Sequence, residues 1–255
     1  MNKKKCLIVG YGTVGSNLYT ELFNLSCDVY DKYKNINDGL DREYPEDFEY
    51  DIAFICVDTP LSNEVMYKSL DCTEVLNAIN ENDAKIYVIK STIPVGYTDS
   101  LKKLTGKRIV FSPEYYGGTQ HCNNYKFDFT ILGGEKEDCK EVIQVLQNVY
   151  DGRHKFIMTD SKTAEMAKFM ENAWIAMKVS FCNDFYTACQ KSDISYEELR
   201  ELFILDPRVN PSHTFVYADH PYWDSHCLNK DVPSIAYQFD MPLLKSIIKI
   251  NNDRK

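Results

Sequence analysis

The chain has 255 residues, of which 44% are hydrophobic and 26% charged, proportions typical of a globular protein with a buried core. Its 38 acidic and 29 basic side chains give a net charge of -9. This charge argues against general binding to nucleic-acid phosphates, which requires clustered Lys and Arg. The basic start, Lys3 to Lys5, lacks the apolar region of a signal peptide, and no apolar run approaches the roughly 20 residues that span a bilayer. We therefore expect a soluble cytoplasmic protein that binds neither nucleic acid nor membrane.

The nine cysteines are scattered along the chain without a CxxC pair, so neither a zinc ribbon nor a dithiol redox site is indicated. Several of them, Cys6, Cys27, Cys56 and Cys182, lie in apolar patterns typical of strands or helices. We interpret these cysteines as reduced thiols that act mainly as small core residues.

The first part of the chain alternates between strand and helix patterns. An apolar run at Lys5 to Val9 leads into glycines, apolar residues at helical spacing follow from Val14 to Leu25, and a second strand pattern covers 27–31. The polar segment 32–49 is expected to be a connection with room for a short helix. Further strand-like runs lie at 52–57, 86–89, 109–111, 127–132 and 154–158. Alternating strands and helices predict an α/β fold with a Rossmann-like, mainly parallel sheet.

Helical patterns dominate after Gly133 and Gly134. They cover 135–150, then Ser161 to about Lys191 with Ser161 and Thr163 as candidate N-caps, then 195–203 and 233–250. A loop rich in Pro, His and aromatic residues is expected at 206–231. We predict two domains, an NAD-binding Rossmann domain at 1–158 and a helical, dimerisation-type domain at 159–255.

The segment from Gly10 to Gly15 has the G-x-G-x-x-G spacing of a dinucleotide-binding loop. It follows a strand, opens a helix and is followed by Asp31, 21 residues after Gly10, at the end of the next strand. Gly10 permits the tight turn, Gly12 lets the backbone approach the pyrophosphate, and Gly15 lets the helix pack against the strand. Because Asp31 can bond ribose hydroxyls and would repel a 2′-phosphate, the pattern favours NAD over NADP. FAD, or a Rossmann sheet without a cofactor, are the alternatives.

Five further segments occur in the order and at the intervals of a known family. They are Val57-Asp58-Thr59-Pro60, Ser91-Thr92-Ile93-Pro94-Val95-Gly96, Ser112-Pro113-Glu114-Tyr115, Ala164-Glu165-Met166-Ala167-Lys168 continuing to Asn172, and His226-Cys227-Leu228-Asn229-Lys230-Asp231. Together they resemble the UDP-glucose/GDP-mannose dehydrogenase family, and within it most of all the UDP-glucose 6-dehydrogenases. The resemblance extends over nearly the whole chain.

That family oxidises a nucleotide-sugar alcohol to a carboxylate in two NAD-dependent steps through a covalent cysteine. The resemblance implies that Cys227 attacks the C6 aldehyde to give a thiohemiacetal and then a thioester. His226 and Lys230 are available to stabilise its thiolate. Lys168 would stabilise the developing oxyanion, and Asn172, one helical turn on, would hold the same oxygen or a water.

The remaining roles implied by the resemblance complete a candidate site. Asp231 would position the hydrolytic water or act as a base, with Thr92 assisting from the cofactor side. Glu114, Lys168 and Asn172 are candidate substrate contacts. The candidate cofactor-binding residues are Gly10, Gly12, Thr13, Val14, Gly15, Asp31, Thr59, Thr92 and Lys230. The family also implies a homodimer formed through the helical segment after Asp160.

The sequence departs from the family pattern in three places. The glutamate that follows the family's N-P-E-F motif is missing after Tyr115, and the segment 220–226 has no glycine where the family is glycine-rich. We also expect the family's C-terminal UDP-binding domain to be absent from this chain. These departures leave two alternatives open: a repurposed NAD-binding member without full dehydrogenase activity, or a dehydrogenase for a smaller alcohol.

A metal site is the remaining alternative for the histidine-rich loop. His213, His220, His226 and Cys227 lie seven, six and one residues apart, spacings that fit no common zinc site. We therefore expect no metal ion.

Overall fold

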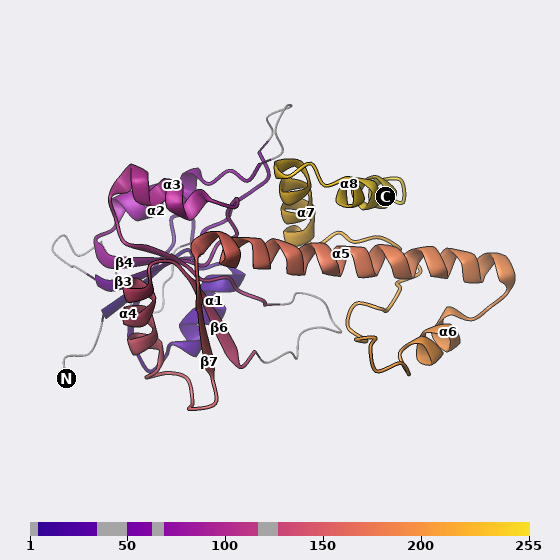
Figure 1. Cartoon of the computed structure of the whole chain (residues 1–255), viewed down its shortest axis with the longest axis horizontal. Coiled ribbons are helices and arrows are strands. Elements are labelled where there is room, and N and C mark those ends of the chain that lie inside the picture. Colours follow the sequence, from indigo (N-terminus) through magenta and orange to yellow (C-terminus); the bar gives the residue numbers. More distant parts are fainter. Residues whose placement is uncertain (1–4, 35–49, 63–68, 117–126) are drawn as a thin grey trace. The chain divides into compact units, whose positions relative to one another are not determined.

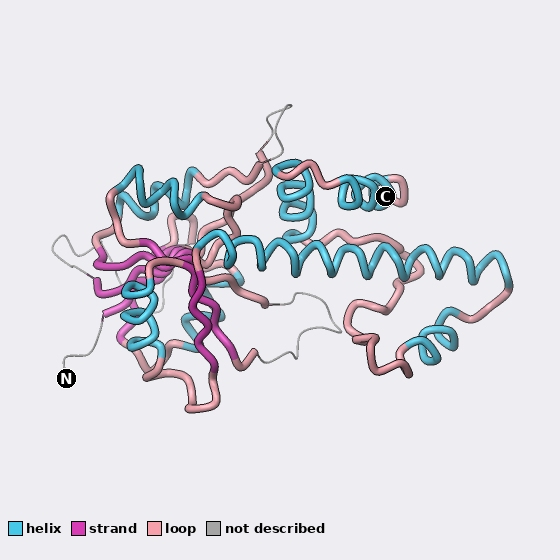
Figure 2. The backbone as a smooth tube through the Cα atoms, in the orientation of Figure 1, coloured by secondary structure: helices cyan, strands magenta, loops and turns pink. Residues whose placement is uncertain are grey.

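The computed structural model describes residues 5–34, 50–62, 69–116 and 127–255 (Figures 1 and 2). The described residues form two compact units. Unit 1 contains residues 5–34, 50–60, 70–116 and 127–168, and unit 2 contains residues 61–62, 69 and 169–255. The predicted domain boundary between residues 158 and 159 stays a prediction. The short helix considered for the segment 32–49 lies, from residue 35 on, outside the described residues.

Unit 1 is built on a seven-stranded sheet with the order β2-β1-β3-β4-β5-β6-β7. The strands are β1 (Lys5–Val9), β2 (Ser26–Tyr30), β3 (Tyr50–Ile55), β4 (Ala84–Ile89), β5 (Ile109–Phe111), β6 (Phe129–Gly133) and β7 (Lys155–Thr159). All neighbouring strands run parallel except β5 and β6, which are antiparallel. The structure thereby confirms the predicted α/β fold with a mainly parallel, Rossmann-like sheet.

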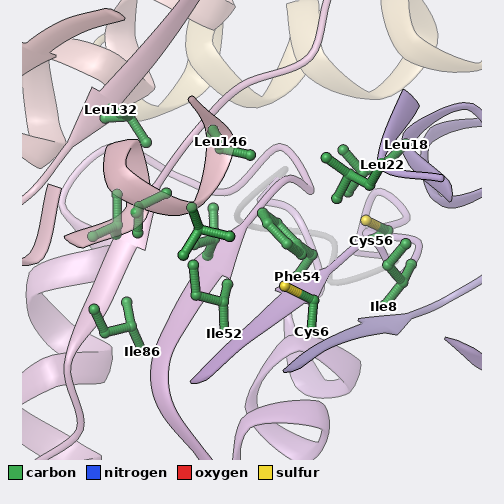
Figure 3. Packing of buried hydrophobic residues seen from close by; sticks show 14 of the residues in the cluster. Cys6, Ile8, Leu18, Leu22, Ile52, Phe54, Cys56, Ile86, Leu132 and Leu146 are labelled. Atoms are coloured by element: carbon green, nitrogen blue, oxygen red, sulfur yellow. The ribbon is translucent and has the colours of Figure 1, made fainter. Parts of the chain in front are cut away.

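Four helices cover the two faces of this sheet (Figure 1): α1 (Thr13–Glu21) and α4 (Lys136–Leu146) on one face, α2 (Thr73–Glu81) and α3 (Tyr97–Thr105) on the other. Successive side chains of a strand point to opposite faces, so alternate residues of β1 and β3 enter the same core. Figure 3 shows part of the cluster on the α1/α4 face, in which Cys6 and Ile8 of β1 lie with Phe54 of β3 and Leu18 and Leu22. This packing holds β1, and with it the glycine loop that follows, in place.

Unit 2 is helical. It contains most of α5 (Ser161–Ser192) together with α6 (Tyr196–Phe203), α7 (His226–Gln238) and α8 (Pro242–Asn252). Trp223, just before α7, donates its ring N–H to Ser180 on α5 over 3.1 Å. Its backbone N–H and C=O bond the amide of Asn251 on α8. One buried tryptophan thus connects three helices of the unit.

The predicted loop at 206–231 was wrong at its end, because residues 226–231 form the first turns of α7. Ser225 caps this helix by accepting a hydrogen bond from the backbone N–H of Leu228. The single helical segment predicted at 233–250 is in fact two helices. They are separated at Asp240, whose φ of 49° ends the first of them.

The start of α5 also differs from the prediction. Asp160 caps the helix, since its carboxylate accepts hydrogen bonds from the backbone N–H and the hydroxyl of Thr163. The predicted cap Ser161 is instead the first helical residue, and its hydroxyl donates to Asp99 over 2.7 Å. Among the described residues, no helix combines the length and the hydropathy needed to cross a bilayer.

Candidate functional site

The glycine loop joins β1 to α1 at the carboxyl end of the sheet. Gly10 has a φ of 94°, and a Cβ there would lie 2.7 Å from the carbonyl oxygen of Cys56. A Cβ on Gly15 would lie 1.9 Å from the carbonyl oxygen of Gly10. Both positions therefore require glycine for packing within the protein, as the sequence predicts for the turn and for the helix–strand contact.

Gly12 differs from these two glycines because a Cβ there would meet nothing within 4 Å. It precedes α1, whose first turn has no side-chain cap among the described residues. Thr13 and Val14 begin that helix. The backbone N–H groups of an uncapped helix start favour a negatively charged group such as a phosphate. The open space at Gly12 and this uncapped start fit the pyrophosphate of a dinucleotide.

Asp31 follows β2 and fastens the glycine loop. One carboxylate oxygen accepts a hydrogen bond from the backbone N–H of Tyr11 over 2.6 Å, and the other accepts from the N–H groups of Tyr33 and Lys34 over 2.9 Å. The Lys34 ammonium in turn donates to the carbonyl oxygen of Tyr11. The acid is thus held beside the loop, where an acid in a Rossmann unit faces the adenosine ribose. Its bond to the ribose stays a prediction.

The segments containing Thr59 and Thr92 lie together after β3 and β4. The buried Thr59 hydroxyl donates to the carbonyl oxygen of Thr92 over 2.8 Å. The Ser91 hydroxyl donates to the carbonyl oxygen of Val57 over 2.6 Å. Two motifs more than 30 residues apart in sequence are therefore joined at the edge where ligands bind in open α/β sheets.

Glu165 has a role that the sequence does not reveal. Its fully buried carboxylate accepts hydrogen bonds from the N–H of Gly96 and from the N–H and hydroxyl of Thr98, at the start of α3. Burial raises the pKa of Glu165, and these hydrogen bonds oppose the rise. The glutamate of the A-E-x-x-K motif therefore caps a helix that lies almost 70 residues earlier, rather than stabilising the start of its own helix.

Lys168 lies one turn after Glu165, with its ammonium 4.8 Å from the centre of the Tyr115 ring. Glu114, which precedes Tyr115 in the motif at 112–115, forms an ion pair with the buried ammonium of Lys90. Lys90 also donates to the hydroxyl of Ser112 over 3.0 Å. Burial raises the pKa of Glu114, and the positive charge of Lys90 opposes this rise. Lys90 is thus a part of the candidate site that sequence reasoning missed, although it directly precedes Ser91.

In unit 2, the structure brings three of the predicted residues together. Asp231 is buried, and its two oxygens accept hydrogen bonds from the Asn172 amide over 2.6 Å and from the Lys230 ammonium over 2.8 Å. Cys227 lies in the first turn of the same helix, α7, with an exposed side chain. The N-terminal turn of a helix favours a negatively charged group, such as a thiolate.

The histidine-rich loop is described over its whole length, 206–231. Within the described ranges, no group of three or more His, Cys, Asp or Glu side chains is arranged to hold a metal ion.

Comparison with known proteins shows the family. Residues 34–153 match the model of the UDP-glucose/GDP-mannose dehydrogenase family NAD binding domain, and residues 162–253 match the central domain of the same family. The matched NAD binding domain confirms the cofactor that the glycine loop and Asp31 predict. The loop itself precedes the matched residues, so the two observations are independent.

Individual relatives agree with this assignment. The chain is 28% identical over 218 residues to a UDP-glucose 6-dehydrogenase from Campylobacter jejuni, covering 82% of this chain and 54% of that protein. It is 29% identical over 218 residues to a UDP-N-acetyl-D-mannosamine dehydrogenase from Methanococcus aeolicus, covering 80% of this chain and 48% of that protein. The chain thus spans about half the length of these curated relatives.

A solved structure shares the fold. The UDP-D-ManNAc dehydrogenase from Pyrococcus horikoshii superimposes with a TM-score of 0.80 at 22% identity, covering 98% of this chain and 68% of that chain. With both family domains matched in order, the chain belongs to the UDP-glucose/GDP-mannose dehydrogenase family of NAD-dependent nucleotide-sugar dehydrogenases.

Proposed function

We propose that the chain carries the NAD-dependent oxidation of a nucleotide sugar at C6 from alcohol to carboxylate, with UDP-glucose as the first substrate to test. The observation that carries this proposal is the arrangement in unit 2. Cys227, Lys230 and Asp231 occupy the first turns of α7, and Asn172 from α5 is bonded to Asp231. These four residue types at these positions are the ones that the family resemblance assigns to the reaction.

Cys227 is the proposed nucleophile. Its thiolate forms a bond to the aldehyde carbon produced by the first oxidation, and the carbonyl oxygen takes up a proton to give a thiohemiacetal. Loss of two electrons and two protons turns this adduct into a thioester. Water then breaks the carbon–sulfur bond, which releases the carboxylic acid and returns the thiol. NAD supplies the two-electron acceptor for each oxidation.

Asp231 is the proposed positioning group or base for that water. Because Asn172 and Lys230 hold both of its oxygens, its orientation is fixed before substrate arrives. The family resemblance assigns to Lys168 the positive charge that stabilises the oxyanion. Thr92, whose carbonyl oxygen is bonded by Thr59, is assigned to the cofactor side of the same reaction.

The second candidate function is NAD binding without complete oxidation. It is favoured by the segment 112–116, where Glu114 is the one acid and is engaged by Lys90. Such a protein would bind NAD but stop before thioester hydrolysis.

A homodimer and a cytoplasmic location belong to the same proposal. The helical part of unit 2 exposes large apolar side chains along α5, among them Met170, Trp174, Phe181 and Phe185. Their exposure supports association through this helix, the segment that the family resemblance assigns to dimerisation. The nine cysteines are scattered along the chain without a CxxC pair, as expected for reduced thiols in a reducing compartment. This pattern supports the cytoplasmic location.

The direct test is to mix the protein with NAD and UDP-glucose and to follow NADH by absorbance and the sugar by mass spectrometry. The expected result is uronic acid with two NADH formed per sugar, and none from Cys227→Ala. Covalent sugar that accumulates on Cys227 would support the second candidate function instead. NAD binding by calorimetry with neither turnover nor binding of a UDP-sugar would overturn the dehydrogenase proposal. The same assay is repeated with UDP-N-acetylmannosamine as the second candidate substrate.

A further inference from the structure

Two cysteine thiols face each other beneath the dinucleotide loop of unit 1. Cys6 of β1 and Cys27 of β2 are direct partners in the parallel register of these strands. Side chains of partnered residues in neighbouring strands leave the same face of a sheet, and the strands are about 4.8 Å apart. A disulfide requires a Cα–Cα distance of roughly 4.4–6.8 Å, so the backbone spacing at this pair permits one.

We propose that Cys6 and Cys27 form a reversible disulfide under oxidising conditions, and that this bond lowers the affinity of the Rossmann unit for NAD. The relevant oxidant class is a peroxide. The inference goes beyond the dehydrogenase proposal, since it concerns the control of cofactor binding and assigns no role in the sugar chemistry.

Cys27 is suited to react first. It is half-buried, and it lies on β2, the edge strand of the described sheet, whereas Cys6 is fully buried. The pKa of the Cys27 thiol is lowered, mainly by a hydrogen bond from Cys6, while burial and Asp28 oppose this. By contrast, burial raises the pKa of Cys139, in the same core cluster, to about 11. Because the thiolate is the nucleophile, Cys27 should react with peroxide faster than Cys139.

The reaction balances with peroxide as the only oxidant. The Cys27 thiolate attacks one peroxide oxygen, the O–O bond breaks, and a sulfenic acid forms as the released hydroxide takes up a proton. The Cys6 sulfur then attacks the Cys27 sulfur, loses its proton and displaces the hydroxyl group as water. Two thiols are oxidised by two electrons, and one peroxide is reduced to two waters.

The position of the pair connects the bond to the cofactor loop. Cys6 lies four residues before Gly10 and Cys27 four residues before Asp31. The two strand ends are joined at the loop, where the N–H of Gly10 donates to the carbonyl oxygen of Tyr30 over 2.8 Å. A disulfide would draw the strands together, because its Cβ atoms are only about 3.8 Å apart.

The loop has little room to absorb such a shift. A Cβ on Gly10 or Gly15 would collide with backbone, so the backbone around this turn is already in close contact. A movement of β1 against β2 should therefore displace Gly12 relative to Asp31. The same constraint strains the disulfide, and strained disulfides are the readily reduced ones.

The sequence makes the bond simple to detect. Trypsin cuts after Lys5 and after Lys32 and releases residues 6–32 as one peptide, whose only cysteines are Cys6 and Cys27. After peroxide treatment and alkylation, this peptide should carry no alkyl group and weigh two hydrogen masses less than the unalkylated reduced peptide. Treatment with dithiothreitol before alkylation should restore two alkyl groups. A peptide that still takes up two alkyl groups after peroxide, or that is joined to another peptide, would overturn the proposal.

The coupling to NAD is tested by calorimetry on the full chain in a Cys227→Ser background, which removes the one thiol that is exposed among the described cysteines. Peroxide should weaken NAD binding about fivefold or more, the lower end of typical coupling factors, and dithiothreitol should restore it. Cys27→Ser and Cys6→Ala should bind NAD but lose this sensitivity, while Cys139→Ala should keep it.

Each outcome has a distinct meaning. If Cys6→Ala fails to fold, Cys27→Ser alone tests whether the peroxide sensitivity of NAD binding is lost. Its side chain is only half-buried, so this variant should still fold. A mapped disulfide with unchanged NAD affinity would overturn the control of cofactor binding. Failure of the reduced protein to bind NAD would count against the cofactor assignment, and the peptide map would still decide whether the disulfide forms. Conversely, saturating NAD should disfavour the disulfide in a glutathione redox buffer by the same factor.

Discussion

The amide of Asn172 on α5 donates a hydrogen bond to the buried carboxylate of Asp231 on α7, with 2.6 Å between nitrogen and oxygen. The bond joins two family motifs that lie 59 residues apart in sequence. It also leaves Asp231 with both oxygens occupied, since Lys230 bonds the other one. Asp231, the proposed base, is therefore also part of the framework of unit 2.

This double role predicts the effect of removing the amide. Asn172→Ala should lower the free energy of unfolding by about 2 kcal/mol, because a buried carboxylate loses a hydrogen bond to one of its oxygens. Urea denaturation measures this. Asn229→Ala is the matched control, since Asn229 also donates to an aspartate, the exposed Asp224. Its effect should stay within about 0.5 kcal/mol. Equal losses in the two variants would contradict the prediction.

The glycine loop predicts opposite effects on stability for the same Gly→Ala change at two positions. Gly12→Ala should leave the free energy of unfolding nearly unchanged, because the added Cβ meets nothing within 4 Å, yet it should weaken NAD binding about tenfold or more by blocking the approach of the pyrophosphate. Gly15→Ala should instead destabilise the fold, because its Cβ would lie 1.9 Å from the carbonyl oxygen of Gly10. Thermal unfolding and calorimetry with NAD separate the two. Unchanged NAD affinity in Gly12→Ala would argue against this binding mode.

The buried ion pair of Lys90 and Glu114 predicts a strong coupling. Lys90→Met should cost about 3–5 kcal/mol of stability, since it leaves a largely buried carboxylate without its counter-charge. Adding Glu114→Gln to that variant should recover part of the loss. A double-mutant cycle by urea denaturation measures the coupling, with Lys140→Met, from the exposed pair with Glu137, as the control. Additive losses at the Lys90 pair would contradict the prediction.

His154 predicts a pH dependence of stability. Its ring stacks on Tyr150 with centroids 4.0 Å apart, and burial lowers its pKa below 6.5. As the pH falls through 6.5, the unfolded chain takes up the proton before the folded one, so the free energy of unfolding decreases in the window below 6.5.

The matching experiment compares urea unfolding across that window. His154→Phe keeps an aromatic ring against Tyr150 and should flatten the decrease. Thr130→Val removes the hydrogen bond that the Thr130 hydroxyl shares with the His154 ring over 2.9 Å, but keeps the titrating group, so the decrease should persist. A decrease of the same size in His154→Phe and the parent protein would assign it to other groups.

The sequence predicted the strands and most helices of unit 1 well, because their signals are local. Periodic apolar residues and the glycine spacing report directly on backbone geometry. The same signals failed at residues 226–231, where the run of His, Asn, Lys and Asp suggested a loop. Ser225 caps a helix there instead, and its buried face is set by packing within unit 2.

By itself, the sequence determined the Rossmann-type sheet, NAD as the cofactor, and the family through its ordered motifs. Only the tertiary structure decided which motif residues support one another. It showed that Glu165 caps α3, that Lys90 pairs with Glu114, and that Cys6 faces Cys27. The physical reason is that a side chain's chemistry is local, whereas its partner is chosen by strand register and packing between segments that are distant in the chain.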